Sequence, residues 1–159
     1  MSDLTSVNLK MFIADTINEV FDTMLSMQVS LTDAGPRPEM EGDRIVGLVS
    51  LVGDVVGSVA VCVDTDFARI ITAAMLGMDP NDIGEEEIHD VIGELSNMIG
   101  GDLKSKLCDS GFPCKLSIPS ITSGSDFKIE PMEWLQHKCL AVKNGSHTAF
   151  VETFIKNGS

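Results

Sequence analysis

The stretch IVGLVSLVGDVVGSVAVCV, residues 45–63, contains the strongest fold signal in this chain of 159 residues. Its two halves, 45–52 and 55–63, are rich in β-branched residues, which favour strands. Gly53 and Asp54 stand between the halves and suit a tight turn. The sequence therefore predicts a β-hairpin here.

Helical patterns lie on both sides of this hairpin. Apolar residues recur at helical spacing over residues 7–27. Asp64 or Asp66 can cap a second helix that ends before Gly77. The longest helical pattern runs over residues 84–111, and its acidic first turn suits the positive end of the helix dipole.

The end of the chain is rich in strand signals. Residues 115–122, 140–143 and 148–155 each predict a strand, and Asn144-Gly145 is a strong hairpin signal between the last two. Strands and helices do not alternate regularly, so a parallel sheet is disfavoured. We expect one α+β domain over residues 1–159, with a mostly antiparallel sheet packed against three helices.

Composition excludes several function classes. The net charge of −13 disfavours binding to nucleic acid or to anionic membrane surfaces. No apolar run approaches the roughly 20 residues of a membrane span, and no signal-peptide pattern opens the sequence. The four cysteines lack the spacing of a zinc site or a disulfide scaffold, so we expect free thiols. A cytoplasmic protein is the resulting prediction.

One face of the long helix carries a polar stripe. At 100° per residue, Asp90, Glu94, Asn97 and Gly101 fall opposite the apolar positions. Glu94 and Asn97 are three residues apart, so their side chains project together. A carboxamide can hold an attacking water and a carboxylate can pair with a cation, which suits hydrolysis of a partner's acyl phosphate.

Other interpretations of this helix are open at this stage. An exposed Glu and Asn on an amphipathic helix are most often a solvated face. Gly93, Gly100 and Gly101 are poor helix formers, each costing about 1 kcal/mol against alanine. They can leave helix surface bare for a protein partner, or they can allow close packing against the sheet.

The segment DVIGELSNMIGGDLK, residues 90–104, resembles the signature helix of the CheC/CheX/FliY family of CheY phosphatases. Asp90, Glu94 and Asn97 match that motif position by position, and Pro119 is the counterpart of its downstream proline. The resemblance spans nearly the whole chain and favours the CheX type. It implies a CheC/CheX-like fold with an internal pseudo-twofold repeat.

The resemblance also implies a function and roles for single residues. The expected activity is dephosphorylation of a phosphorylated CheY-like response regulator. Asn97 would orient the attacking water, and Glu94 would pair with the receiver's lysine. Asp90, Gly93 and Gly101 would contact the partner. The chain would need no cofactor of its own, since Mg²⁺ would belong to the receiver.

Two further expectations follow from the same resemblance. Asp15 and Asn18 stand where the other half of the repeat would carry its motif, but aspartate is one methylene shorter than glutamate. We interpret this pair as a remnant of the motif or as a coincidence, and we expect one active site per chain. CheX-type proteins pair through their sheets, so a homodimer is expected.

Three rival functions can be weighed against this one. A metal site built from Glu85, Glu86, Glu87 and His89 is disfavoured, because consecutive helical residues point in different directions. A nucleophilic hydrolase is disfavoured because no histidine lies in a motif with a serine or cysteine nucleophile. The strongest rival is a receiver-binding or flagellar-switch-like adaptor of the same fold, which docks without catalysis.

Overall fold

Seven strands form one antiparallel sheet in the part of the chain that the computed structural model describes, residues 4–35, 42–124 and 135–158. The strand order is β1-β6-β7-β3-β2-β4, and β5 also pairs with β2. The strands are β1 (Ser30–Asp33), β2 (Arg44–Gly53), β3 (Val55–Asp64), β4 (Cys114–Leu116), β5 (Ser120–Gly124), β6 (Gln136–Asn144) and β7 (His147–Asn157).

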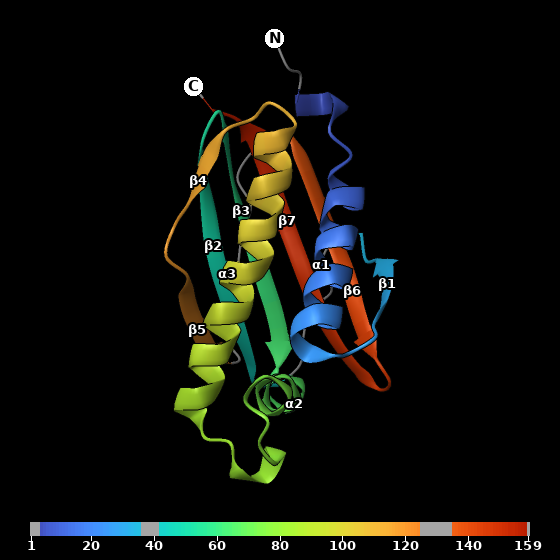
Figure 1. Cartoon of the computed structure of the whole chain (residues 1–159), viewed down its shortest axis with the longest axis vertical. Coiled ribbons are helices and arrows are strands. Elements are labelled where there is room, and N and C mark those ends of the chain that lie inside the picture. Colours follow the sequence, from blue (N-terminus) through green and yellow to red (C-terminus); the bar gives the residue numbers. More distant parts are fainter. Residues whose placement is uncertain (1–3, 36–41, 125–134, 159) are drawn as a thin grey trace.

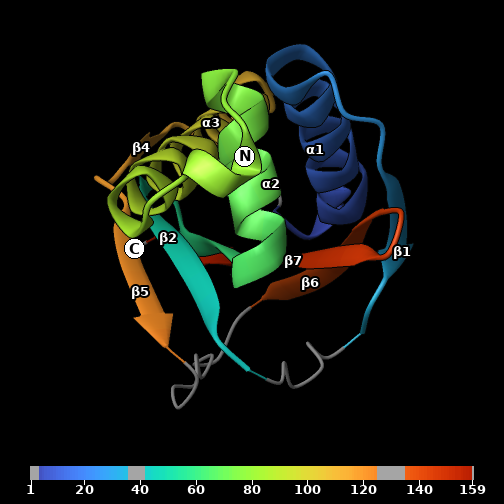
Figure 2. The same ribbon diagram turned by 90° about the horizontal axis from the view of Figure 1, so that it is seen from below.

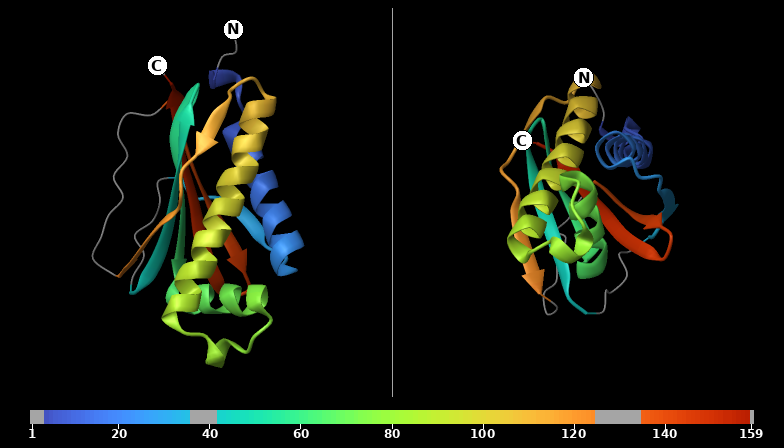
Figure 3. Two further views of the ribbon diagram at one scale, coloured as in Figure 1. Left: turned by 60° about the vertical axis from the view of Figure 1, so that its left-hand side comes forward. Right: turned by 60° about the horizontal axis from the view of Figure 1, so that its bottom comes forward.

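Three α-helices cover one face of this sheet (Figures 1 and 2). They are α1 (Leu9–Leu25), α2 (Thr65–Leu76) and α3 (Glu85–Asp109), with short 3-10 turns η1 (Leu4–Ser6) and η2 (Pro80–Asp82). Helices α1 and α3 lie side by side along the strands, and α2 crosses near the start of α3 (Figure 3). The α+β architecture predicted from the sequence is confirmed.

The main core lies between the helices and the sheet. Each helix buries one apolar stripe, as the helical spacing predicts. Burying each large apolar side chain of these stripes contributes about 1.5–3 kcal/mol to the free energy of folding. The largest fully buried side chains are those of Phe21, Phe67, Leu4, Leu9, Ile13, Ile17, Leu51, Ile71, Ile88, Ile92, Leu95 and Ile99.

Both predicted hairpins are confirmed. Strands β2 and β3 pair from Arg44 opposite Asp64 to Leu51 opposite Gly57. Strands β6 and β7 pair up to Asn144 opposite His147. Gly145 in that turn has a φ of 61°, a left-handed conformation that glycine adopts without a steric penalty.

The second helix begins as its capping signal predicts. Asp64 is the N-cap of α2, and its carboxylate accepts a 2.7 Å hydrogen bond from the amide of Phe67. The helix ends at Leu76, and Gly77 follows in the left-handed conformation. No helix of the described ranges is both long and apolar enough to cross a membrane.

The single strand predicted over residues 115–122 is wrong, because this segment forms two strands, β4 and β5. Between them, Ser117 still bonds to Ser50 through a 2.9 Å backbone hydrogen bond. Pro119 has no amide hydrogen to donate to β2, so the ladder is interrupted there. Each strand then pairs with its own part of β2.

One strand and one strand boundary were also missed. The short edge strand β1 pairs with β6 but has mostly exposed residues, so it shows no apolar pattern. Strand β6 begins at Gln136 rather than at the predicted Leu140, because its first residues are polar. The predicted pseudo-twofold repeat remains a prediction.

Candidate functional site

The polar stripe of α3 faces outward, as predicted. Asp90, Glu94 and Asn97 are exposed, and Gly101 is half-buried. Within the described ranges, no hydrogen bond or ion pair engages the side chains of Asp90, Glu94 or Asn97. Their polar atoms are therefore available to another molecule.

The prediction that Gly93 leaves the helix surface open to a partner is wrong. Gly93 is buried, and a Cβ there would lie 3.5 Å from Cδ1 of Ile121 in β5. Gly100 is also buried, and a Cβ there would lie 2.6 Å from Cγ2 of Val49. The absence of side chains lets α3 pack closely against the sheet, which was the alternative interpretation of these glycines.

Another glycine brings β2 directly under the middle of α3. A Cβ on Gly47 would overlap Oγ of Ser96 and lie 3.3 Å from the carbonyl oxygen of Ile92. Ser96 is fully buried, and its hydroxyl donates a 2.7 Å hydrogen bond to that same carbonyl. This close contact holds the helix backbone immediately before Asn97.

A groove between α1 and α3 opens beside the polar stripe. Asn97 lines this α1–α3 groove, so the predicted catalytic residue is part of its wall. The other lining residues come from both helices and include apolar as well as polar side chains. They are Glu19, Val20, Thr23, Met24, Met98, Gly101, Asp102 and Ser105.

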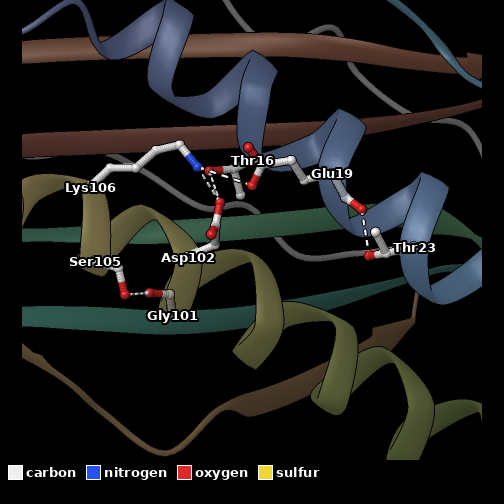
Figure 4. Close-up of polar contacts among 7 residues, drawn as sticks. All are labelled: Thr16, Glu19, Thr23, Gly101, Asp102, Ser105 and Lys106. Carbon is white, nitrogen blue, oxygen red and sulfur yellow. Dashed lines mark hydrogen bonds and ion pairs between the residues drawn. The ribbon is translucent and has the colours of Figure 1, made fainter.

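A polar network joins the two helices beside this groove (Figure 4). The hydroxyl of Thr16, which is fully buried on α1, donates a 2.7 Å hydrogen bond to the carboxylate of Asp102 on α3. Lys106 donates to the same carboxylate and lies 3.3 Å from Oε2 of Glu19. These four residues therefore brace α1 against α3.

The network shifts the ionisation of its members. Burial disfavours ionised Asp102, but hydrogen bonds from Lys106 and Thr16 and the charge of Lys106 outweigh it, so the pKa of Asp102 is lowered. Burial disfavours charged Lys106, but hydrogen bonds and charge from Asp102 and Glu19 outweigh it, so the pKa of Lys106 is raised. Both groups are held in their charged forms.

Asp102→Ala should lower the free energy of unfolding by about 1–2 kcal/mol at neutral pH, because it leaves the Thr16 hydroxyl buried without its acceptor. The folded-state pKa of Asp102 lies below 3.8, so its contribution is present above that pH and is lost as the pH falls through the folded value. Urea unfolding at several pH values measures both effects.

Asp109→Ala is the matched control for this prediction, since Asp109 is an exposed aspartate on the same helix. It lies at the C-terminal end, where a negative charge is not favoured by the helix dipole, so its removal should not destabilise the fold. Equal unfolding free energies for the two variants would contradict a bracing role for Asp102.

The pair Asp15 and Asn18 lies on α1, and both residues are exposed. Asn18 lines a separate shallow groove with Glu19, Asp22 and Met27. The structure therefore does not bring Asp15 and Asn18 together with Glu94 and Asn97 in one pocket.

The acidic start of α3 does not form a convincing cation site. Glu85 and His89 line one pocket, but Arg44 and Arg69 line it as well, and their positive charges disfavour a cation. Among the described residues, no three His, Cys, Asp or Glu side chains come together in an arrangement that could hold a metal ion.

Two of the three histidines and the buried cysteines have roles in packing. His137 bonds to Glu152 at 2.9 Å and stacks on Phe154, and His147 stacks on Phe67. All four cysteines are free, and three of them are buried. Burial raises the pKa of Cys114 to about 11, so its thiol stays protonated and is a poor nucleophile.

Sequence reasoning missed the groove and the network beside the polar stripe. The only local signal was the spacing of Asp102 and Lys106, four residues apart on a helix. Thr16 and Met24 are more than 70 residues away in the sequence, and only the packing of α1 on α3 brings them to the site.

Comparison with known proteins identifies relatives of this chain. The sequence pattern of the family described as "Chemotaxis phosphatase CheX" matches residues 45–143. The CheY-P phosphatase CheX of Thermotoga maritima is 32% identical over 87 residues, which are 54% of this chain and 56% of that protein. The match thus spans little more than half the length of this curated relative.

Solved structures share the fold over nearly the full length. The chemotaxis protein CheX from Vibrio vulnificus has a TM-score of 0.81 at 25% identity, over 94% of this chain and 100% of that chain. A chain of the CheX–CheY–BeF3–Mg²⁺ complex from Borrelia burgdorferi has a TM-score of 0.79 at 19% identity, over 95% and 99%. At the lower identity, the likeness supports the fold alone.

Proposed function

Because this chain belongs to the CheX family of chemotaxis phosphatases, we propose that it dephosphorylates the aspartyl phosphate of a CheY-like response regulator. The Thermotoga relative is named a CheY-P phosphatase, and the Borrelia structure contains CheX together with CheY. The name of the Thermotoga relative supports a phosphorylated receiver as the substrate here, and the Borrelia complex shows that a protein of this fold binds such a receiver domain.

The observation that carries this proposal is the exposed pair Glu94 and Asn97. Both lie on one turn of a helix that Gly47, Gly93 and Gly100 allow to pack tightly on the sheet. A side chain on such a rigid element can be inserted into a partner at a defined position. Neither side chain is used by a described residue of its own chain, so both can act on a partner.

Asn97 acts on the attacking water. Its carboxamide has one acceptor and two donors, so it can hold a water molecule in line with the acyl phosphate of the receiver. Oxygen of that water bonds to phosphorus as the bond from phosphorus to the aspartate oxygen breaks. The products are inorganic phosphate and the free aspartate carboxylate, and no covalent intermediate on this chain is needed.

Glu94 acts on the receiver rather than on the water. Its carboxylate pairs with the lysine of the receiver's active site, and this pairing sets the depth at which Asn97 enters. Asp90 and Gly101 lie on the same stripe and contact the docked receiver. Mg²⁺ belongs to the receiver, so this chain supplies two side chains to a site that its partner otherwise holds.

It is energetically reasonable that this chain positions the water while the receiver holds the phosphoryl group and its counter-charges. Positioning one water molecule is worth about 10²–10³ in rate, or about 3–4 kcal/mol. A single inserted carboxamide can supply this if the phosphoryl group and its counter-charges are already in place. Location in the cytoplasm and a homodimer paired through sheet edges are part of the same proposal.

Phosphate release from a panel of phosphorylated receivers tests the proposed function. The chain should accelerate release from at least one receiver by about 10²-fold over the receiver's own rate. It should release little phosphate from small acyl phosphates, since the receiver supplies the metal ion and lysine. Binding of a receiver without acceleration would contradict the phosphatase and favour the adaptor interpretation.

A further inference from the structure

The α1–α3 groove shares a wall with the proposed catalytic residue. Asn97 lines it, and so do Met24 from the end of α1 and Met98 from the next position on α3. Met24 is 50% exposed although it is a large apolar side chain. A half-exposed methionine beside a working residue is a candidate contact for another protein.

The reach of Asn97 decides what covers this groove. A carboxamide acts on water only within hydrogen-bond distance, about 2.6–3.2 Å. A receiver that brings its phosphate to Asn97 must therefore lie directly over this part of α3. Since Asn97 is part of the groove wall, the receiver surface next to its phosphorylated aspartate also lies over the groove.

The chemistry of the groove indicates what it holds. Its lining includes Val20, which is buried, and its two methionines are flexible and polarisable. Of its carboxylates, Asp102 is already paired with Lys106, and Lys106 also pairs with Glu19. The groove thus suits an apolar side chain better than a cation.

We propose that the α1–α3 groove is a docking subsite that takes an apolar side chain of the phosphorylated receiver between Met24 and Met98. This inference rests on the proposed function and adds a specificity contact to it. The groove contributes to receiver affinity, whereas Asn97 contributes to the chemical step. The contacts of Thr16 with Asp102 and of Lys106 with Glu19 join the two helices that form its walls.

Met24→Ser tests this proposal, with Met11→Ser as its matched control. Both methionines lie on α1 and both are 50% exposed, but only Met24 lines the groove. Met24→Ser should raise KM for the phosphorylated receiver about 10-fold and leave kcat within about 2-fold, because an apolar contact made before the chemical step is lost. Met11→Ser should change neither, and Met24→Leu should restore most of the affinity.

Affinity for the beryllofluoride-bound receiver gives a second readout that does not depend on hydrolysis. Met24→Ser should weaken this binding about 10-fold, again with Met11→Ser unchanged. Equal affinities and equal KM values for the two serine variants would overturn the subsite. A loss confined to kcat would overturn it too.

The outcomes separate this inference from the proposed function. If wild-type protein releases phosphate and the two serine variants behave alike, the subsite is wrong and the phosphatase stands. If wild-type protein binds the receiver without releasing phosphate and Met24→Ser weakens binding, the subsite stands and the phosphatase is wrong. A change in the oligomeric mass of Met24→Ser by light scattering would instead assign the groove to a second copy of this chain, against the proposal.

Discussion

Asn97→Ala should lower the accelerated rate of phosphate release by about 10²–10³-fold while receiver affinity changes by less than about 2-fold. The side chain is exposed and makes no hydrogen bond within the described part of the chain, so its removal should change the free energy of unfolding little. Its proposed partner is a water molecule and not a group of the receiver, so docking does not depend on it. Stopped-flow phosphate release and a binding titration measure the two quantities separately.

A control variant and a second variant of the polar stripe complete this experiment. Asn81→Ala removes an exposed asparagine in η2, away from the polar stripe, and should leave the rate unchanged. Glu94→Ala should weaken docking as well as the rate, because the carboxylate pairs with the receiver itself. Turnover by Asn97→Ala at the wild-type rate would contradict the proposed role of Asn97 in orienting the attacking water.

Gly47→Ala should destabilise the protein by about 2–3 kcal/mol, which corresponds to a fall in Tm of about 5–10 °C. The added Cβ would overlap Oγ of the fully buried Ser96 and would also lie 3.0 Å from Cβ of Ser96, which side-chain rotation cannot move. Helix α3 must then shift outward from β2. Because Asn97 is the next residue, a shift of about 1 Å can also lower kcat by up to about 10²-fold.

The double variant Gly47→Ala/Ser96→Gly separates this contact from other effects of an alanine in β2. Removing the Ser96 side chain makes space for the new methyl group, and the remaining cost is about 1 kcal/mol for glycine in a helix. Denaturant unfolding of both single variants and the double variant measures the coupling. If the two substitutions are simply additive, the clash between β2 and α3 is not the cause.

Local patterns predicted most of the secondary structure because they act within a few residues. The β-branched run around Gly53 forms its own hairpin, and Asp64 caps the helix that follows it. The break at Pro119 was missed because a proline between two strand-forming segments affects hydrogen bonding only where a neighbouring strand is present. The short strand β1 was missed because an exposed edge strand needs no apolar pattern.

The outward stripe of Asp90, Glu94 and Asn97 was determined by the sequence alone, because helical periodicity orients side chains without reference to the rest of the chain. Periodicity could not decide the roles of Gly93 and Gly100, since a bare position on a helix suits either a partner or a sheet. Only the tertiary structure places Ile121 and Val49 against them. The same holds for the groove and for the contact of Thr16 with Asp102, because these join segments far apart in the sequence, and no local interaction specifies which of them meet.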